Sequence, residues 1–140
     1  MNITVRVSAP VNPTEIEEKV RIAITNIFPL ELALKNFGIP QLYGEGDLES
    51  LRKLHMVLRD LRILDTARRI FINNKESNTI QFCLNKQVAL MGKANFPVGE
   101  ESLGSIHVEI SSDNDEDLMN IIDWLAPETE EGEPIMEIEL

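Results

Sequence analysis

Residues 3–27 read ITVRVSAPVNPTEIEEKVRIAITNI, and they contain the two patterns from which the fold follows. Residues 3–8 alternate β-branched apolar side chains with polar ones, which is the period of a strand with one buried face. The Asn-Pro-Thr-Glu run at 12–15 joins a capping residue, a proline suited to the first helical turn and an acid suited to the positive helix end. It predicts a helix whose inward face consists of Ile16, Val20, Ala23 and Ile27. The stretch therefore predicts a strand followed by an amphipathic helix that packs on it.

The rest of the chain continues with paired strands and helices. A hairpin is expected over residues 30–43, with its second strand at a sheet edge because Pro40 has no N–H for a ladder bond. Residues 48–73 are rich in helix formers and predict one long helix, or two joined near residues 63–65. The remaining expected elements are strands at 79–84 and 105–110, a short helix at 85–91, extended chain at 93–96, loops at 44–47 and 97–102, and a final helix at 113–125. Because paired strands between helices argue against βαβ alternation, the sequence predicts an α+β fold, a two-layer sheet-and-helix domain.

Length and composition indicate one compact unit. The chain has 140 residues, of which 43% are apolar, and this is enough for one core. We expect a single α+β domain over residues 1–127 and a mobile acidic tail over residues 128–140. The sequence has no apolar run long enough to cross a membrane and no signal-peptide pattern, and its single cysteine, Cys83, permits no internal disulfide. These features predict a cytoplasmic protein with no membrane partner.

The charge is unevenly distributed along the chain. In total, 13 Lys and Arg stand against 24 Asp and Glu, a net charge of −11. Residues 1–47 sum to −2, residues 48–96 to +5, and residues 97–140 to −14 without a single basic side chain. The net charge argues against avid binding of polyanions. This argument weakens because residues 48–96 carry a positive net charge.

A stripe of cationic side chains runs beside the apolar face of the 48–73 segment. The apolar face consists of Leu51, Leu54, Leu58 and Leu61. Displaced by one residue, a second set recurs at the same spacing over roughly 15 Å of helix, namely Arg52, His55, Arg59 and Arg62, with Arg68 and Arg69 beyond. Guanidinium groups offer planar donor forks that match phosphate oxygens, and a row of them can follow a nucleic-acid backbone without reading its bases. The stripe therefore makes RNA backbone the candidate ligand.

Three other interpretations of this stripe stay open. Its arginines could form a solvated helix flank that pairs with Glu49, Asp60 or Asp65. The basic helix could instead meet the acidic C-terminal third, either within one chain or across a dimer. The acidic tail could also occupy the basic face and compete there with an external polyanion.

No arrangement of reactive side chains predicts an enzyme, a metal site or a cofactor. His55 and His107 are far apart and lie in no zinc-ligand pattern. Cys83 has no neighbouring His or second Cys in the sequence, so we expect a structural thiol. The acidic run at 113–117 lacks the glycine of a calcium loop and has Trp124 at the twelfth position, so we expect these acids to cap a helix.

Three groups of short motifs stand out together. They are LRKL at 51–54 with RILDTARR at 62–69, LNKQVA at 84–89 with Gly92, and ESLGSI at 101–106 with DWLAP at 123–127. In this combination the chain resembles the archaeal uncharacterised protein family 0201 over nearly its whole length, from Val5 to Pro127. The resemblance implies an α+β domain similar in fold to ribosomal protein L five, an archaeal cytoplasmic protein, a homodimer and a role in RNA binding. It implies no reaction.

The resemblance also supplies candidate RNA contacts. They are Arg52, Arg62, Arg68, Arg69, Asn85, Lys86 and Gln87, and the stripe adds Arg59. For residues 85–87 a second interpretation is that they cap the short helix and hold the turn after it. Tyr43 and Trp124 are the only Tyr and Trp and lie outside the basic segment, so base stacking is not predicted.

We therefore expect a non-enzymatic RNA-binding or ribonucleoprotein-associated domain that uses helix arginines for backbone contacts. The alternative is a homodimeric protein-interaction module whose acidic tail docks on a partner. Its apolar contacts would be Ile135, Met136, Ile138 and Leu140.

Overall fold

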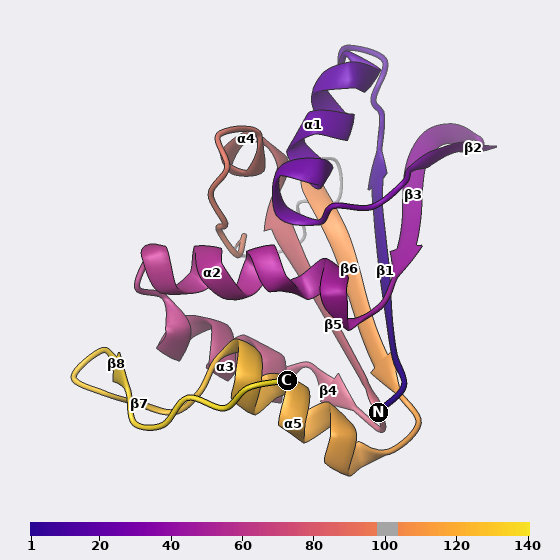
Figure 1. Ribbon diagram of the computed structural model, residues 1–140. Helices are drawn as coiled ribbons and strands as arrows, with labels where there is room; N and C mark the ends of the chain where they lie inside the picture. Colours follow the sequence, from indigo (N-terminus) through magenta and orange to yellow (C-terminus); the bar gives the residue numbers. More distant parts are fainter. Residues whose placement is uncertain (98–103) are drawn as a thin grey trace.

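The computed structural model describes residues 1–97 and 104–140, and it has two layers. One layer is a six-stranded antiparallel sheet in the order β2-β3-β1-β6-β5-β4, and the helices lie on one face of it (Figure 1). The strands of this sheet are β1 (Ile3–Pro10), β2 (Ala33–Phe37), β3 (Ile39–Gly46), β4 (Lys75–Glu76), β5 (Thr79–Asn85) and β6 (Ser105–Ser112). The helices are α1 (Glu17–Ile27), α2 (Arg52–Asp60), α3 (Leu64–Asn73), α4 (Lys86–Leu90) and α5 (Asp115–Leu125), with a short 3-10 turn, η1 (Leu48–Leu51), before α2. The predicted α+β class is confirmed.

The core lies between the sheet and the helices. Val7 pairs with Val108, Val108 pairs with Phe82, and all three side chains are buried. They belong to one buried cluster with helix residues such as Leu58 and Ile121, which are fully buried. The alternate strand positions carry polar side chains on the other face of the sheet. This alternation is the period-two pattern that the sequence shows.

The hairpin is confirmed, but the expected edge position of its second strand is wrong. β3 lies between β2 and β1, and β2 forms the edge. Pairing of β3 with β1 begins at Gln41, one residue after Pro40, so the missing N–H of Pro40 costs no bond to β1. Pro40 instead accepts a hydrogen bond from the Val11 N–H at 2.7 Å. Gly38 has a φ of +88° and makes the tight turn.

Several element boundaries differ from the expectations. Residues 12–15 form a turn before α1, because the Asn12 amide groups donate to Glu15 Oε1 and Asn12 does not act as a helix cap. The expected loop at 44–47 is largely strand, and no strand forms at 93–96. Apart from Pro97, the expected loop at 97–102 lies outside the described residues.

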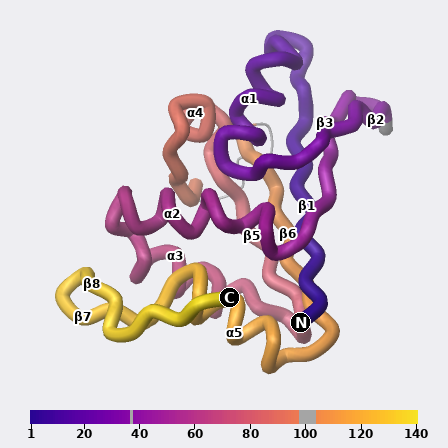
Figure 2. Tube along the Cα trace, in the orientation of Figure 1, coloured from indigo at the N-terminus to yellow at the C-terminus, as the bar shows by residue number. Residues whose placement is uncertain are grey.

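The basic segment folds as two helices, the second of the two expected arrangements. α2 ends at Asp60, α3 begins at Leu64, and Arg62 between them has a φ of +56°. This break turns α3 away from α2, so that α2 crosses the sheet and α3 packs beside α5 (Figure 2). Arg62 therefore does not continue the stripe of α2.

The C-terminal residues fold back onto the domain. After α5, the short ribbon of β7 (Thr129–Glu130) and β8 (Glu133–Pro134) reverses the chain, which returns across α5 toward α2 (Figure 1). Ile138 and Leu140 are partly buried against the core. The tail thus lies against the helices instead of extending freely. No helix among the described residues is both long and apolar enough to span a bilayer.

Gly44 allows the chain before β2 to pack closely against β3. A Cβ atom at Gly44 would lie 2.7 Å from Leu32 Cδ2 and 3.0 Å from the Glu31 carbonyl oxygen. We expect Gly44→Ala to lower the free energy of unfolding by about 1–3 kcal/mol, measured by urea denaturation. Gly104→Ala is the matched control, because a Cβ there meets no described atom within 4 Å. Equal stability of the two variants would contradict this account of the packing.

Candidate nucleic-acid interface

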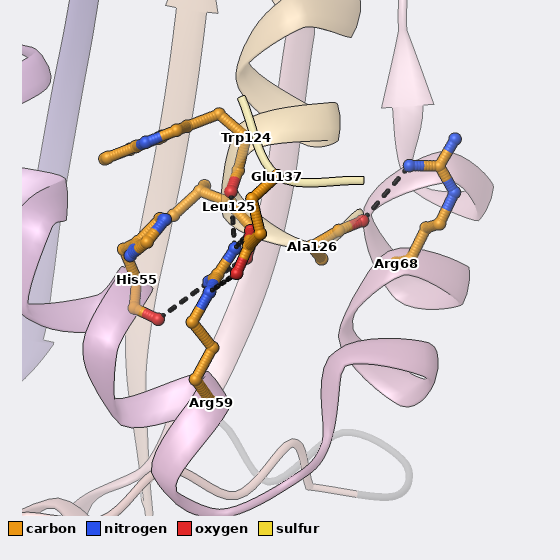
Figure 3. Close-up of polar contacts among 7 residues, drawn as sticks. All are labelled: His55, Arg59, Arg68, Trp124, Leu125, Ala126 and Glu137. Atoms are coloured by element: carbon orange, nitrogen blue, oxygen red, sulfur yellow. Dashed lines mark hydrogen bonds and ion pairs between the residues drawn. The ribbon is translucent and has the colours of Figure 1, made fainter. Parts of the chain in front are cut away.

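Arg59 is the centre of the polar contacts between α2 and the C-terminal part of the chain (Figure 3). Its Nε and Nη2 donate to the two carboxylate oxygens of Glu137 at 2.8 and 2.5 Å. Its remaining N–H groups donate to main-chain oxygens of His55, Trp124 and Leu125 at 2.9, 3.0 and 3.0 Å. All five guanidinium donors are therefore used, and the side chain is only 19% exposed.

Arg52 and His55 precede Arg59 on α2 by two turns and one turn, and they also contact the C-terminal part of the chain. Arg52 donates to both carboxylate oxygens of Glu49 and to the main-chain oxygen of Leu140, the last at 2.7 Å. The His55 ring stacks on Trp124 with centroids 4.5 Å apart, and the Arg52 guanidinium lies 5.7 Å from the Trp124 ring centroid. Burial, and secondarily the charge of Arg59, lowers the pKa of His55 and favours its neutral form.

Arg68 fulfils an equivalent role on α3. It donates to Asp123 of α5 at 2.8 Å and to the Ala126 carbonyl at 3.1 Å, and it lies 3.6 Å from Glu128. Three of the carbonyls that Arg59 and Arg68 bind, those of Trp124, Leu125 and Ala126, lie at the C-terminal end of α5, where main-chain oxygens lack partners within the helix. The two arginines therefore hold α5 and the chain after it against α2 and α3.

The predicted stripe is thus divided. Arg59 and Arg68 are bound by acids and carbonyls of the C-terminal third, as in the interpretation in which the basic helices meet that third. Arg52 pairs with Glu49, as in the helix-flank interpretation, and also donates to the main-chain oxygen of Leu140. Arg62 and Arg69 are exposed, and no ion pair found within residues 1–97 and 104–140 includes either of them. Asp60 and Asp65, which the sequence offered as partners, form no such pair within those ranges either.

The residues of the Asn-Lys-Gln motif divide in the same way. Asn85 caps α4 by accepting a hydrogen bond from the Val88 N–H at 3.0 Å. The Lys86 side chain is buried, and its Nζ donates to the Pro10 carbonyl at 2.6 Å and to Glu15 at 2.9 Å. Only Gln87 is exposed. The helix-capping interpretation therefore describes Asn85, and Lys86 joins α4 to the turn before α1.

Sequence reasoning missed the partners that complete this cluster. Trp124, Glu137 and the main-chain oxygens at the end of α5 lie more than 60 residues from Arg59, so no local spacing indicates them. Sequence reasoning also missed the contact between Cys83 and His107, which are 24 residues apart in the sequence and whose Sγ and Nδ1 atoms lie 3.3 Å apart across β5 and β6. Burial raises the pKa of the Cys83 thiol, which favours its protonated, unreactive form. Among the described residues, no three His, Cys, Asp or Glu side chains gather as metal ligands.

Comparison with known proteins shows the family of this chain. A UPF0201 protein of Methanothermobacter thermautotrophicus is 45% identical over 94% of this chain and 96% of its own length. One of Methanosarcina acetivorans is 40% identical over 99% of this chain and 93% of its own length. The chain belongs to the UPF0201 family. The crystal structure of the UPF0201 protein from Methanococcus jannaschii superposes with a TM-score of 0.84 at 38% identity, covering 95% of this chain and 99% of that one.

The sequence profile of a family described as RNA binding matches residues 4–112 of this UPF0201 protein. That range contains the six-stranded sheet apart from Ile3, and helices α1 to α4, and it ends before α5. The resemblance to the archaeal family is confirmed, while the likeness to ribosomal protein L five stays a prediction.

The burial of Lys86 gives a test of its role. We expect Lys86→Met to lower the free energy of unfolding by about 2–3 kcal/mol, because Glu15 and the Pro10 carbonyl lose a buried donor. Urea denaturation measures the loss, and Gln87→Met, next to it and exposed, should change stability by about 0.5 kcal/mol at most. A Lys86→Met protein of normal stability and weakened RNA binding would show instead that Lys86 contacts phosphate.

The contact between Glu137 and Arg59 should respond to acid. The hydrogen bonds from Arg59 lower the pKa of Glu137, so this contact stabilises the fold above the ordinary carboxyl value of about 4.3 and is lost as the pH falls below it. We expect the fluorescence of Trp124 to change in that window as the C-terminal residues leave α2. Glu137→Gln is the control, since His55 titrates in both proteins. Identical acid transitions in the two proteins would contradict the role given to Glu137.

Proposed function

We propose that this protein is a non-enzymatic RNA-binding domain that contacts the sugar-phosphate backbone through the cations of α2 and α3. Membership in a family whose profile is described as RNA binding supports the ligand class. The homodimer and the cytoplasmic location implied by the resemblance stay predictions.

The observation that carries the proposal is the exposure of Arg62 and Arg69. They lie at the α2–α3 turn and on α3, in the only third of the sequence with a positive net charge. Lys53 is also exposed on α2, and Arg52 keeps about half of its side chain in solvent beside Glu49. Exposed guanidinium groups bind phosphate without first losing an internal partner. Backbone contacts of this kind give affinity without base specificity.

A second candidate function is docking of a protein partner. Ile135 and Met136 expose 62% and 69% of their surface just after the β7–β8 ribbon, within the acidic C-terminal segment. Apolar side chains at such a position could meet a partner's apolar surface. A protein complex of this kind would be far less sensitive to salt than an RNA complex.

The salt dependence of RNA binding tests the leading proposal. We expect Arg62→Gln/Arg69→Gln to weaken binding of a single-stranded oligoribonucleotide. The slope of log affinity against log salt should flatten by about 1.4, roughly 0.7 for each lost phosphate contact. Fluorescence anisotropy with a labelled oligoribonucleotide at several salt concentrations measures both quantities.

The matched control is Arg6→Gln/Lys35→Gln, which removes the same charge from the strands β1 and β2. In the wild-type protein Arg6 pairs with Glu109, and Lys35 lies over the Tyr43 ring, both on the helix-free face of the sheet. The control should keep the wild-type slope. Equal flattening in the two double variants would mean that only net charge matters, and a wild-type protein that binds no RNA at low salt would refute the proposal.

A further inference from the structure

The C-terminal residues 137–140 occupy a surface made of groups that suit nucleic acid. This surface, the α2–α5 groove, is formed by Arg52, His55, Arg59 and Trp124. A hollow of about 550 Å³ remains between Arg52, His55, Trp124 and the returning chain. The groove combines two guanidinium groups with two stacked rings, and the acidic chain end covers it.

Arg59 is already oriented to bind a phosphate. Three of its N–H groups are held by the main-chain oxygens of His55, Trp124 and Leu125, which fixes the plane of the guanidinium. The other two, on Nε and Nη2, form one edge of the fork and bind Glu137 in a bidentate manner (Figure 3). A phosphate has the same pair of acceptor oxygens and fits the same edge. If Glu137 leaves, Arg59 keeps its orientation and gains a free anion-binding edge.

Trp124 lies directly beside this edge. It is 3% exposed, stacked on His55 and close to Arg52, while the residues Glu137 to Leu140 line the same hollow. Removal of the chain end would uncover part of this aromatic pair next to two cations. Aromatic rings beside a cationic track are the usual combination for single-stranded nucleic acid. Sequence spacing did not predict base stacking, because Trp124 lies on α5, far along the chain from the basic helices.

Most side chains of the chain end are exposed. Ile135, Met136, Glu137 and Glu139 are all exposed, and only Ile138 and Leu140 are partly buried. The Glu137 side chain is 45% exposed, so its bond to Arg59 is open to solvent and to competing anions. Residues 135–140 follow a ribbon of two-residue strands, and they form no helix or strand themselves.

We propose that the α2–α5 groove is a second RNA-contact site, in which residues 137–140 take the place of a single RNA strand until RNA displaces them. In the RNA complex a phosphate replaces the Glu137 carboxylate on Arg59, and a nucleobase reaches the Trp124–His55 pair. This inference rests on the proposed RNA-binding function. The inference adds a second binding site to that function. Anions with low affinity for Arg59 do not occupy this site, because any ligand must first displace the carboxylate of Glu137.

The test compares Glu137→Gln with Glu139→Gln. Both variants remove one negative charge from the same exposed segment, but only Glu137 is bonded to Arg59. If the closed arrangement holds about 70–90% of the molecules, Glu137→Gln should raise the affinity for a ten-nucleotide oligouridine about three- to tenfold. Glu139→Gln should raise it less than about twofold, the effect of net charge alone. Anisotropy at fixed low salt measures the affinities.

Trp124 supplies an independent readout, because it is the only tryptophan. Its emission should change when oligouridine binds to the wild-type protein, since the chain end leaves the ring and a base replaces it. In Arg59→Lys/Glu137→Gln, which keeps the positive charge but loses the fork, the gain in affinity should disappear. Circular dichroism tests whether this variant is folded. If it is unfolded, the comparison of Glu137→Gln with Glu139→Gln decides alone.

The outcomes separate the two proposals. RNA binding by the wild-type protein with equal affinities of Glu137→Gln and Glu139→Gln, or with unchanged Trp124 emission, overturns the second site and leaves the proposed function standing. Absence of RNA binding in all three proteins overturns the proposed function, and the second site with it.

Discussion

The antiparallel pairing of β1 with β6 is the interaction on which the rest of the structure depends. It joins residues 3–8 to residues 107–112, so the first and last strands of the sheet lie side by side at its centre. β3 and β5 then extend the sheet on either side. Because α5 follows β6 directly, this pairing brings the acidic C-terminal third onto the helix face, where the basic helices α2 and α3 already lie.

This arrangement explains the uneven charge of the sequence. The middle third carries +5 and the last third −14, and in the folded protein the two meet at Arg59 with Glu137 and at Arg68 with Asp123. Both arginines are largely buried and also bind carbonyls at the end of α5. Partly buried ion pairs that share hydrogen bonds with main-chain groups are more specific than exposed ones, because removing one partner leaves polar groups unsatisfied. Part of the charge segregation therefore stabilises the fold.

The same contacts determine which cations each functional proposal uses. Cations that the C-terminal residues leave exposed, Arg62 and Arg69, are available to RNA at once, whereas Arg59 is available only after Glu137 leaves. Arg52 is about half exposed, but it also binds Glu49 and Leu140. A protein with a net charge of −11 repels nucleic acid at long range, so binding must rely on short-range contacts with a local group of cations.

Local patterns were enough to predict most of the elements. The alternation in residues 3–8 and 105–110 and the apolar spacing of α1, α2 and α5 gave the strands, the helices and the two-layer class, because burial of one face imposes a fixed period on the sequence. Asn85 and Asn114 cap α4 and α5, where local side-chain to main-chain bonds decide the helix start. The helix start expected at Asn12 was wrong because Asn12 donates to Glu15, which also accepts from the distant Lys86. The place of β3 was wrong because its pairing with β1 depends on the tertiary structure.

The sequence by itself determined that the protein has a row of cations beside a row of leucines. Only the tertiary structure decided which of those cations meet solvent, since Arg59 and its partner Glu137 are 78 residues apart and the break at Arg62 ends the row. The physical reason is that hydrophobic periodicity is a local property of the chain, whereas the pairing of charges depends on how the elements pack, which no spacing between neighbouring residues records.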